Sequence, residues 1–243
     1  MLLFFISYGN MITLKTEFQN TPSKIIKTDD GKLKGITIDI INMIQKKTDY
    51  RFTYKNSDST LLRIKEELVK NRIDVYFGML KDGGREKYID FIEPLYNIHY
   101  VVVTLAENQE KIESIDDLKK ASQKTPVLTV FGSIIEEYLN SNGIKNEAGG
   151  KSIETNLDKL LGKRANYVVY HDIAIHYGIN EKKYRGKFKV LKLNIKEDSL
   201  WLVVSFKLDK KIKDELKEIV RNLKKESEWK KMMKKYNLEE NLK

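Results

Sequence analysis

Short runs of β-branched and aromatic residues alternate along the chain with longer segments whose apolar residues recur every three or four positions. The first pattern is typical of buried strands and the second of amphipathic helices. No internal repeat or low-complexity linker interrupts the alternation. Because strands that alternate with helices pair mostly in parallel, the pattern predicts an α/β fold with mostly parallel sheets.

The pattern also predicts where the elements lie. The expected strands are residues 12–16, 35–37, 51–54, 73–77, 98–105, 127–131, 166–170 and 200–205. The expected helices are residues 39–47, 59–71, 133–142, 156–161, 172–177 and 209–224, with an N-capped turn at 114–118 and a last helix that Ser227 caps. The run at 98–105 is too long for a compact hairpin, so we expect it to cross from one domain to another.

One arginine stands in the segment RIDVYFGMLKDGGREKYIDFIEPLY, where a β-run ends at a glycine and a polar turn delivers Arg85 before a second apolar run. A guanidinium held at the end of a buried strand offers a planar fork of donors that fits a carboxylate. The alternative is a surface ion pair of Arg85 with Asp82, Asp90 or Glu93, which would contribute little energy. The residues alone leave both interpretations open.

Composition narrows the class of protein. The chain has 243 residues and 41% hydrophobic residues, enough for two modest domains or one large one. Its formal charge of +10 comes from lysines scattered among acidic residues. That scatter is typical of a solvated surface and argues against nucleic-acid binding, although the charge favours a place beside an anionic membrane. The absence of cysteine excludes disulfides and thiolate catalysis.

No catalytic or metal-binding motif emerges. The three histidines are His99, His171 and His176, and the last two lack the i, i+4 spacing of a metal-binding helix. There is no serine nucleophile elbow, and the GGKS sequence at Gly149 lacks the earlier glycine of a phosphate loop. We therefore expect no metal and no cofactor.

The N-terminus opens with an apolar run, MLLFFI, far shorter than the about 20 residues that span a bilayer. It lacks the positively charged start of a full signal peptide. Ser7 and Gly9 put small residues where a signal peptidase cuts after Gly9. Two interpretations stay open: residues 1–9 are the end of a truncated signal peptide, or the run belongs to a first strand.

The order of motifs resembles the bacterial extracellular solute-binding proteins of family 3, the periplasmic receptors of ABC importers for polar amino acids. GKLKGITIDI at residues 31–40 is similar to the family's GKLxGFDVDL, and GMLKDGGR at 78–85 to GGMTxTxxR. Further similarities follow in order over almost the whole chain: 68–74 to LxxGKID, 90–96 to DFSxPY, 114–119 to SxxDLKG, 130–133 to VxxGT, and 229–236 to the closing helix that ends in KKY. Each motif alone is weak, but their common order is strong support.

The resemblance implies the periplasmic-binding-protein type II fold. This fold has two α/β lobes joined by two crossing strands, with a ligand cleft between the lobes and closure by hinge motion. Lobe 1 would comprise residues 1–100 and 197–243, and lobe 2 residues 101–196. The long runs at 98–105 and 200–205 fall where the family's crossing strands lie.

The resemblance also implies site residues in lobe 1. Arg85 matches the arginine that grips the ligand carboxylate, and Gly78 and Leu80 match positions that contribute backbone groups before it. Asp82 stands where a threonine usually helps to hold the carboxylate, so it would lower the affinity for a plain carboxylate. Phe18 is the candidate for an aromatic on which the ligand stacks.

In lobe 2, Ser133 matches the first hydroxyl of a loop whose amides receive an anion near a helix start. Ile134 replaces the second hydroxyl of that loop. The family's ammonium-binding aspartate falls on His171 or Asp172, because the alignment slips by one residue there. Leu61 stands where a stacking aromatic is frequent, and Leu80 stands where a hydroxyl residue is usual. Together with Asp82 and Ile134, these departures argue against binding of a standard amino acid.

The implied function is that of a monomeric binding protein in the periplasm or outside the cell. It would capture a small polar ligand, an amino acid or a related carboxylate, and present it to the membrane permease of an ABC transporter. It would not be an enzyme. Two alternatives stay open: a ligand-sensing regulatory module of the same fold, and a cyclohexadienyl-dehydratase-like enzyme in which His171 would be the histidine placed for acid–base chemistry.

Overall fold

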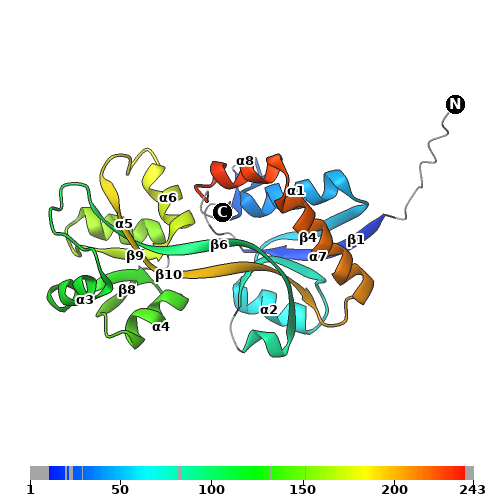
Figure 1. Cartoon of the computed structure of the whole chain (residues 1–243), viewed down its shortest axis with the longest axis horizontal. Helices are drawn as coiled ribbons and strands as arrows, with labels where there is room; N and C mark the ends of the chain where they lie inside the picture. Colours follow the sequence, from blue (N-terminus) through cyan, green and yellow to red (C-terminus); the bar gives the residue numbers. More distant parts are fainter. Residues whose placement is uncertain are drawn as a thin grey trace. The chain divides into compact units, whose positions relative to one another are not determined.

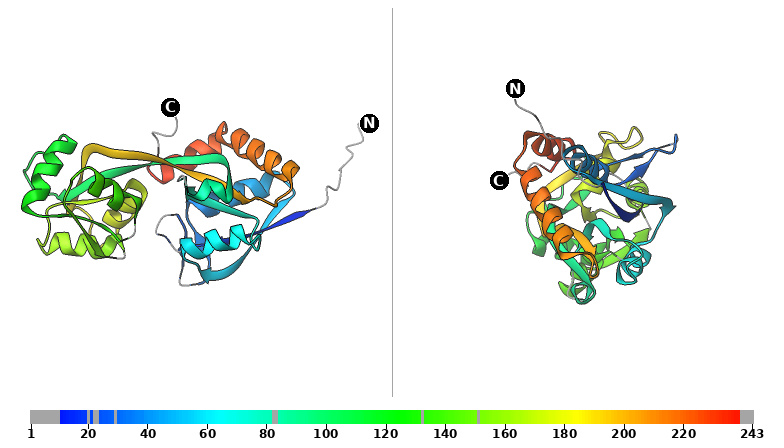
Figure 2. Two further views of the ribbon diagram at one scale, coloured as in Figure 1. Left: turned by 90° about the horizontal axis from the view of Figure 1, so that it is seen from below. Right: turned by 90° about the vertical axis from the view of Figure 1, so that its right-hand side faces the viewer.

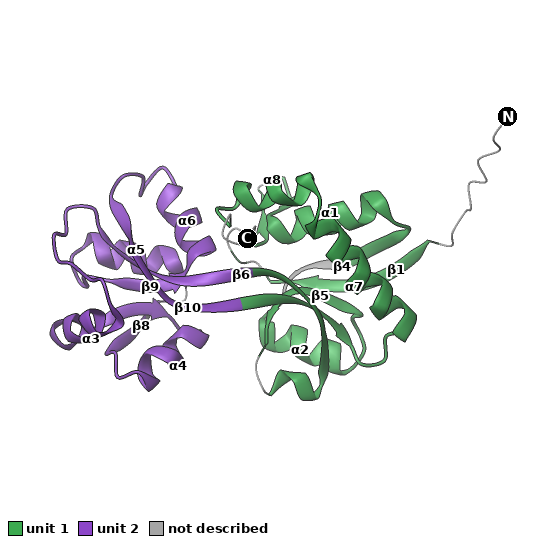
Figure 3. Ribbon diagram, viewed as in Figure 1, with its two compact units in different colours: residues 1–96, 199–243 green, residues 97–198 purple. Residues whose placement is uncertain are grey.

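The computed structural model describes residues 11–19, 21, 24–28, 30–81, 84–131, 133–150 and 152–238. The chain divides into two compact units: unit 1 is Met1–Tyr96 with Ser199–Lys243, and unit 2 is Asn97–Asp198 (Figure 3). The boundaries fall inside two long strands, β6 (Ile89–Leu105) and β10 (Phe188–Ser205). Each of these strands therefore contributes residues to both units. The two lobes expected from the sequence, with their ligand-binding roles, stay a prediction.

Unit 1 combines elements from both sides of unit 2 in the sequence (Figure 1). Besides its parts of β6 and β10, it contains β1 (Ile12–Phe18), β2 (Ile26–Lys27), β3 (Leu33–Lys34), α1 (Ile36–Lys47), β4 (Tyr50–Asp58), α2 (Leu61–Val69), β5 (Val75–Leu80), the 3-10 turn η1 (Arg85–Lys87), α7 (Lys210–Lys224) and α8 (Ser227–Lys235). β1 and β4 pair in parallel from Ile12 and Tyr50 onward. β5 pairs antiparallel with the end of β10, so that Leu80 lies opposite Leu200.

Apolar helix faces build the core of unit 1. On α2, Ile64 and Leu68 are fully buried against a cluster that includes Met79 of β5 and Val203 of β10. The C-terminal helices bury Leu216, Val220, Leu223, Trp229, Met232 and Met233. Asp39 of α1 accepts hydrogen bonds from Lys235 at 2.7 Å and from the Tyr236 hydroxyl at 2.9 Å. Unit 1 thus depends on contacts between the two ends of the described chain.

A buried carboxylate ties β6 to α7. Glu93 is 6% exposed, and its two oxygens accept bonds from Arg221 Nε at 2.9 Å and Lys224 Nζ at 2.8 Å. Removing one partner of a buried ion pair leaves charge uncompensated. Here the cations are 49% and 27% exposed, so water screens part of the loss.

We expect Glu93→Ala to lower the free energy of unfolding by about 2 kcal/mol, because it removes the carboxylate that pairs with Arg221 and Lys224 of α7. Urea denaturation followed by circular dichroism measures the change. Glu218→Ala, on the exposed face of the same helix, is the matched control and should change stability by less than about 0.5 kcal/mol. Equal effects of the two substitutions would show that the Glu93 ion pairs contribute nothing.

Unit 2 is continuous in sequence. Its helices have the green to yellow colours of the middle of the chain in Figure 2. With its parts of β6 and β10, it contains α3 (Ile115–Lys124), β7 (Val127–Val130), α4 (Ile134–Ser141), β8 (Asn146–Gly150), α5 (Ile153–Leu161), β9 (Val168–His171) and α6 (Asp172–Asn180). β7 pairs in parallel with β8 and β9, whereas β6 pairs antiparallel with β9. A buried cluster from α5, α6 and the strands, including Leu157 and Val168, forms the core.

The expectation of mostly parallel sheets is wrong in part. Antiparallel pairs occur beside the parallel ones, because β10 meets β5 and β6 meets β9 in the antiparallel sense, whereas β1 and β4 pair in parallel. Both long strands start earlier than expected, at Ile89 and Phe188. Each of the two strands crosses a unit boundary. It is therefore longer than the apolar run from which it was predicted.

Three local expectations are also wrong. Residues 35–37 are not a strand: Gly35 is the N-cap of α1, and Ile36 and Thr37 are its first residues. β5 does not end at Gly78 but continues to Leu80, because glycine tolerates the φ of 98° found there. Ser227 does not cap α8 but is its first residue, after Glu226 at the N-cap.

The proposed leader, residues 1–9, lies outside the described residues. Among the helices that the structure describes, none combines the length and the apolar character needed to cross a membrane.

Candidate functional site

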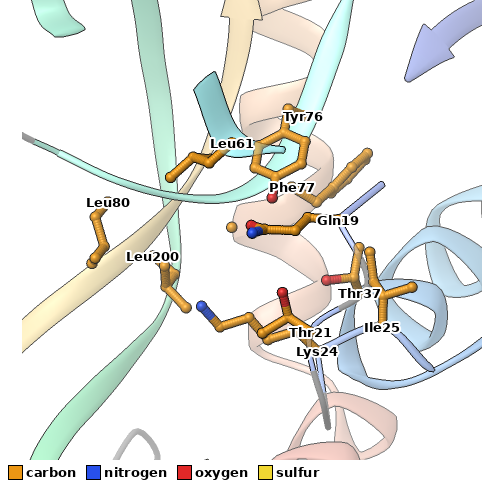
Figure 4. Close-up of a pocket in the computed structure, with 11 residues that line it drawn as sticks. Gln19, Thr21, Lys24, Ile25, Thr37, Leu61, Tyr76, Phe77, Leu80 and Leu200 are labelled. Atoms are coloured by element: carbon orange, nitrogen blue, oxygen red, sulfur yellow. The ribbon is translucent and has the colours of Figure 1, made fainter. Parts of the chain in front are cut away.

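A pocket of about 60 Å³ lies in unit 1, where the end of β5 meets the segment after β1 and the start of α1 (Figure 4). Its volume suits a few water molecules or one small chemical group. The lining residues are Gln19, Thr21, Lys24, Ile25, Thr37, Leu61, Tyr76, Phe77, Gly78, Leu80 and Leu200. Of the predicted site residues, this pocket brings together Gly78 and Leu80.

The lining has a polar side and an apolar side. Figure 4 shows the amide of Gln19 and the amine of Lys24 extending into the pocket, with Leu80 and Leu200 across from them. The hydroxyl-bearing Thr21 also belongs to the polar side. A cation and several neutral hydrogen-bonding groups beside an apolar wall suit a small ligand with one polar or anionic end and an aliphatic part.

One glycine holds the polar side in place. Gly35 has a φ of 126°, and the carbonyl of Lys24 lies so near that a Cβ on Gly35 would be 2.2 Å from its oxygen. The same oxygen accepts the backbone N–H of Thr37 at 3.2 Å. The turn that carries Lys24 is therefore fixed against the first turn of α1, and only glycine permits this approach.

Arg85 begins the 3-10 turn that follows β5, and its Nη1 donates to the carbonyl oxygen of Leu80 at 2.9 Å. Burial raises the pKa of Tyr76 to about 12, and the positive charge of Arg85 opposes that rise. Arg85 is thus bonded to one residue of the pocket lining and acts electrostatically on another. It is not itself part of the lining.

Two of the carboxylates considered as ion-pair partners of Arg85 have partners on α7. Asp90 accepts from Lys213 at 2.6 Å, and Glu93 pairs with Arg221 and Lys224. The third, Asp82, lies outside the described residues.

Phe18 is buried at 5% exposure, and its ring centroid lies 4.6 Å from that of Tyr54. It does not line the pocket, although its neighbour Gln19 does. A stacking role for Phe18 stays a prediction.

In unit 2, Ser133 occupies the N-cap position of α4, but its side chain does not cap the helix. Its Oγ donates to the carbonyl oxygen of Val130 at 2.6 Å and lies 3.5 Å from Thr129 Oγ1. Ile134 is the first residue of α4. The Ser133 hydroxyl thus occupies none of the first-turn amides, although the N–H of Glu136 donates to the Ser133 carbonyl oxygen at 3.0 Å.

The structure separates the two candidates for the ammonium site. The buried His171 is the N-cap of α6: its Nδ1 accepts the backbone N–H of Ala174 at 3.3 Å, and its ring packs on Tyr170 at 4.3 Å between centroids. His171 therefore stabilises the helix start.

Asp172 instead contacts a basic side chain. Its Oδ1 accepts the N–H of Ile173 at 2.7 Å, and its Oδ2 lies 3.3 Å from Nδ1 of His99. Burial raises the pKa of Asp172, whereas hydrogen bonds and the charge of His99 oppose that rise. Asp172 is thus a buried carboxylate with a basic partner.

Sequence reasoning did not assign Gln19, Lys24 or Thr37 to a site, and it considered His99 only as a base or metal ligand. These residues reach the pocket because of the turns that carry them. The pattern of apolar and polar positions along the sequence does not show where such turns lie in space. Within the described ranges, no group of three or more His, Cys, Asp or Glu residues is arranged to hold a metal ion.

Comparison with known proteins identifies the family. The model of the bacterial extracellular solute-binding proteins, family 3, matches residues 12–239. The chain belongs to this family. The family name places its members outside the cytoplasm, and the match confirms the family that the motifs predicted.

Individual relatives are distant in sequence. The L-cystine-binding protein TcyK of Bacillus subtilis (strain 168) is 24% identical over 153 residues, or 61% of this chain and 56% of that protein. The chain thus matches a little over half the length of this relative.

Solved structures show the fold. A Wolinella succinogenes DSM 1740 protein complexed with lysine has a TM-score of 0.76 at 15% identity, covering 92% of this chain and 95% of its own. The ancestral amino acid-binding protein AncCDT-1, a precursor of cyclohexadienyl dehydratase, has a TM-score of 0.74 at 18% identity, with 92% and 95% covered. These similarities confirm the type II periplasmic-binding-protein fold class.

Proposed function

We propose that this protein binds a free amino acid outside the cytoplasm and delivers it to an ABC importer. The observation that carries the proposal is Arg85, which is bonded to Leu80 beside a small polar pocket at the end of β5. Membership of the solute-binding family supports it. Two similar proteins also support it: TcyK is named an L-cystine-binding protein, and the Wolinella protein is complexed with lysine.

Within unit 1, we assign the ligand carboxylate to Arg85, because its fork of donors matches the two oxygens. The pocket residues Gln19, Lys24 and Thr37 would discriminate among ligands by hydrogen bonding. Asp82 would weaken the grip of Arg85 on a plain carboxylate, so a ligand with further polar groups is favoured over a simple carboxylic acid.

Within unit 2, we assign the ligand ammonium to Asp172, since it is the carboxylate of the two candidate positions. The amides at the start of α4, next to Ser133, would add an anion contact. The binding protein would act as a monomer with a membrane permease as its partner, and residues 1–9 would be part of a leader.

We further propose that the protein is not an enzyme. A dehydratase needs a general acid or base, and His171 was the histidine considered for this task. Its Nδ1 is engaged by the first turn of α6, and the residue is 4% exposed. Incubation with prephenate or arogenate should therefore leave the absorbance of either compound unchanged.

A thermal-shift screen tests the binding function. A ligand at 100 times its Kd adds about 2.7 kcal/mol to stability, which corresponds to a rise in Tm of about 5–10 °C for a chain of this size. We expect such a shift from at least one of L-cystine, L-lysine, L-arginine and L-glutamine. For lysine, the matched control is cadaverine, which has the same amines and chain but no carboxylate. No shift with any amino acid would overturn the proposal.

A further inference from the structure

His99 lies at the centre of a charged cluster in unit 2. Its Nδ1 is 3.3 Å from Asp172 Oδ2, and its Nε2 is 3.4 Å from Glu197 Oε2. His99 belongs to β6, Asp172 to α6 and Glu197 to β10. The imidazole therefore bridges carboxylates from two other elements.

With both carboxylates ionised, only one protonation state of His99 satisfies both contacts. A neutral imidazole carries a proton on one ring nitrogen, whereas the imidazolium donates from both. Ionised carboxylates accept hydrogen bonds and donate none. In its charged form, His99 therefore serves Asp172 and Glu197 together, and the cluster of three side chains keeps one net negative charge.

The contact with Asp172 is the stronger of the two. The side chains of His99 and Asp172 are 13% and 9% exposed, whereas that of Glu197 is 50% exposed. Opposite charges attract more strongly where water is scarce. The hydrogen bonds of Asp172 with His99 also offset the cost of burying an ionised carboxylate. Asp172 thus has a basic partner before any ligand arrives.

We propose that His99 is the counter-cation of Asp172 and that it competes with the ligand's ammonium group, which makes ligand binding depend on pH. This inference rests on the proposed function, because it takes Asp172 as the ammonium site. When the ammonium pairs with Asp172, the imidazolium loses its main partner and releases its proton to the buffer. Binding is then weakest at low pH and strengthens as the pH rises.

The other titratable groups around His99 do not account for such a change. They are Tyr100 on β6, Tyr170 and His171 on β9, and Lys196 and Asp198 on β10. Burial raises the pKa of Tyr100 and that of Tyr170 above the usual value of a tyrosine, so both side chains stay neutral below pH 8. Lys196 hydrogen-bonds to Asp198, and His171 accepts an α6 amide through Nδ1. His99 is the group that contacts both Asp172 and Glu197.

Isothermal titration calorimetry with L-lysine and L-cystine tests the competition. For the wild-type protein, we expect the Kd to rise about tenfold when the pH falls from 7.5 to 5.5, with release of close to one proton per ligand at the lower pH. Two buffers of different ionisation heat give the proton count. His99→Gln should make the Kd nearly independent of pH, whereas His176→Gln, the matched control on α6, should keep the wild-type profile.

Two outcomes overturn the inference. One is a wild-type Kd that does not change with pH. The other is a His99→Gln protein whose Kd still rises tenfold when the pH falls. That result would assign the pH dependence to protonation of Asp172 itself. Absence of binding at every pH by all the amino acids of the thermal-shift screen would instead overturn the proposed function.

A measurement without ligand separates these cases further. Nitrogen-15 NMR of the three histidine rings, with the His99 signals identified by their loss in His99→Gln, reports which nitrogens carry protons. At pH 5.5 we expect both His99 nitrogens to be protonated and their N–H protons to exchange slowly. Glu197→Ala should speed the exchange at Nε2 alone. A neutral His99 ring at pH 5.5 would overturn the inference regardless of any ligand.

Discussion

Arg85→Ala is expected to weaken the binding of an amino acid by roughly 30- to 1000-fold, or about 2 to 4 kcal/mol. The guanidinium is fixed to the end of β5 by its bond to the Leu80 carbonyl, so it meets a carboxylate without first losing rotamer freedom. Under the proposed function, truncation also leaves the ligand carboxylate without its charge-assisted bonds. Calorimetric titration with the amino acid that gives the largest thermal shift measures the loss.

Two further variants make the result specific. Arg85→Lys keeps the charge but not the planar fork, so it should recover only part of the affinity. Arg72→Ala removes an arginine of the same unit whose side chain is 63% exposed and pairs with Glu67 at 3.1 Å, and it should bind like the wild type. If Arg85→Ala also bound like the wild type, the carboxylate would have to be assigned to another residue.

Gly35→Ala is expected to lower the free energy of unfolding by about 3 to 5 kcal/mol. The φ of 126° is strained for any residue with a side chain, and the added Cβ would lie 2.2 Å from a backbone oxygen that cannot move alone. Relief requires the Lys24 turn to leave α1, which would also disturb the pocket. Thermal unfolding should therefore begin about 10 °C lower, and any ligand-induced shift should shrink.

The matched control for this substitution is Gly31→Ala. Gly31 has a φ of 78°, but nothing lies within 4 Å of its added Cβ. Only the backbone strain remains, and it costs about 1 to 2 kcal/mol. If the two variants were equally stable, the close approach of the Lys24 carbonyl to Gly35 would make no contribution to the loss of stability.

Local sequence signals predicted many of the elements well. The spacing of Leu216, Val220 and Leu223 predicted α7, and Ser114 predicted the start of α3, where it forms a capping box with Asp117. These features depend only on residues a few positions apart. The position of Arg85 after β5 was likewise predicted, because the polar turn follows the strand directly in sequence.

Other features depend on distant residues, and sequence reasoning missed them. Residues 35–37 look like a strand because Ile36 and Thr37 are β-branched, yet the contact of Gly35 with Lys24 places them in a helix. His99 and Asp172 meet although they are 73 positions apart. A pattern that is read along one segment carries no information about such partners.

Unit 1 is interrupted in the sequence, and this has a consequence for its biosynthesis. A chain that leaves the ribosome from its N-terminus exposes α1 long before α7 and α8 are made, although Lys235 and Asp39 pair across 196 positions. Unit 2 is continuous, so all of its residues emerge before unit 1 is complete. The nascent protein therefore carries a half-built unit 1 with uncovered apolar surface throughout the translation of unit 2. This exposure follows from the order of the chain rather than from the final stability of unit 1.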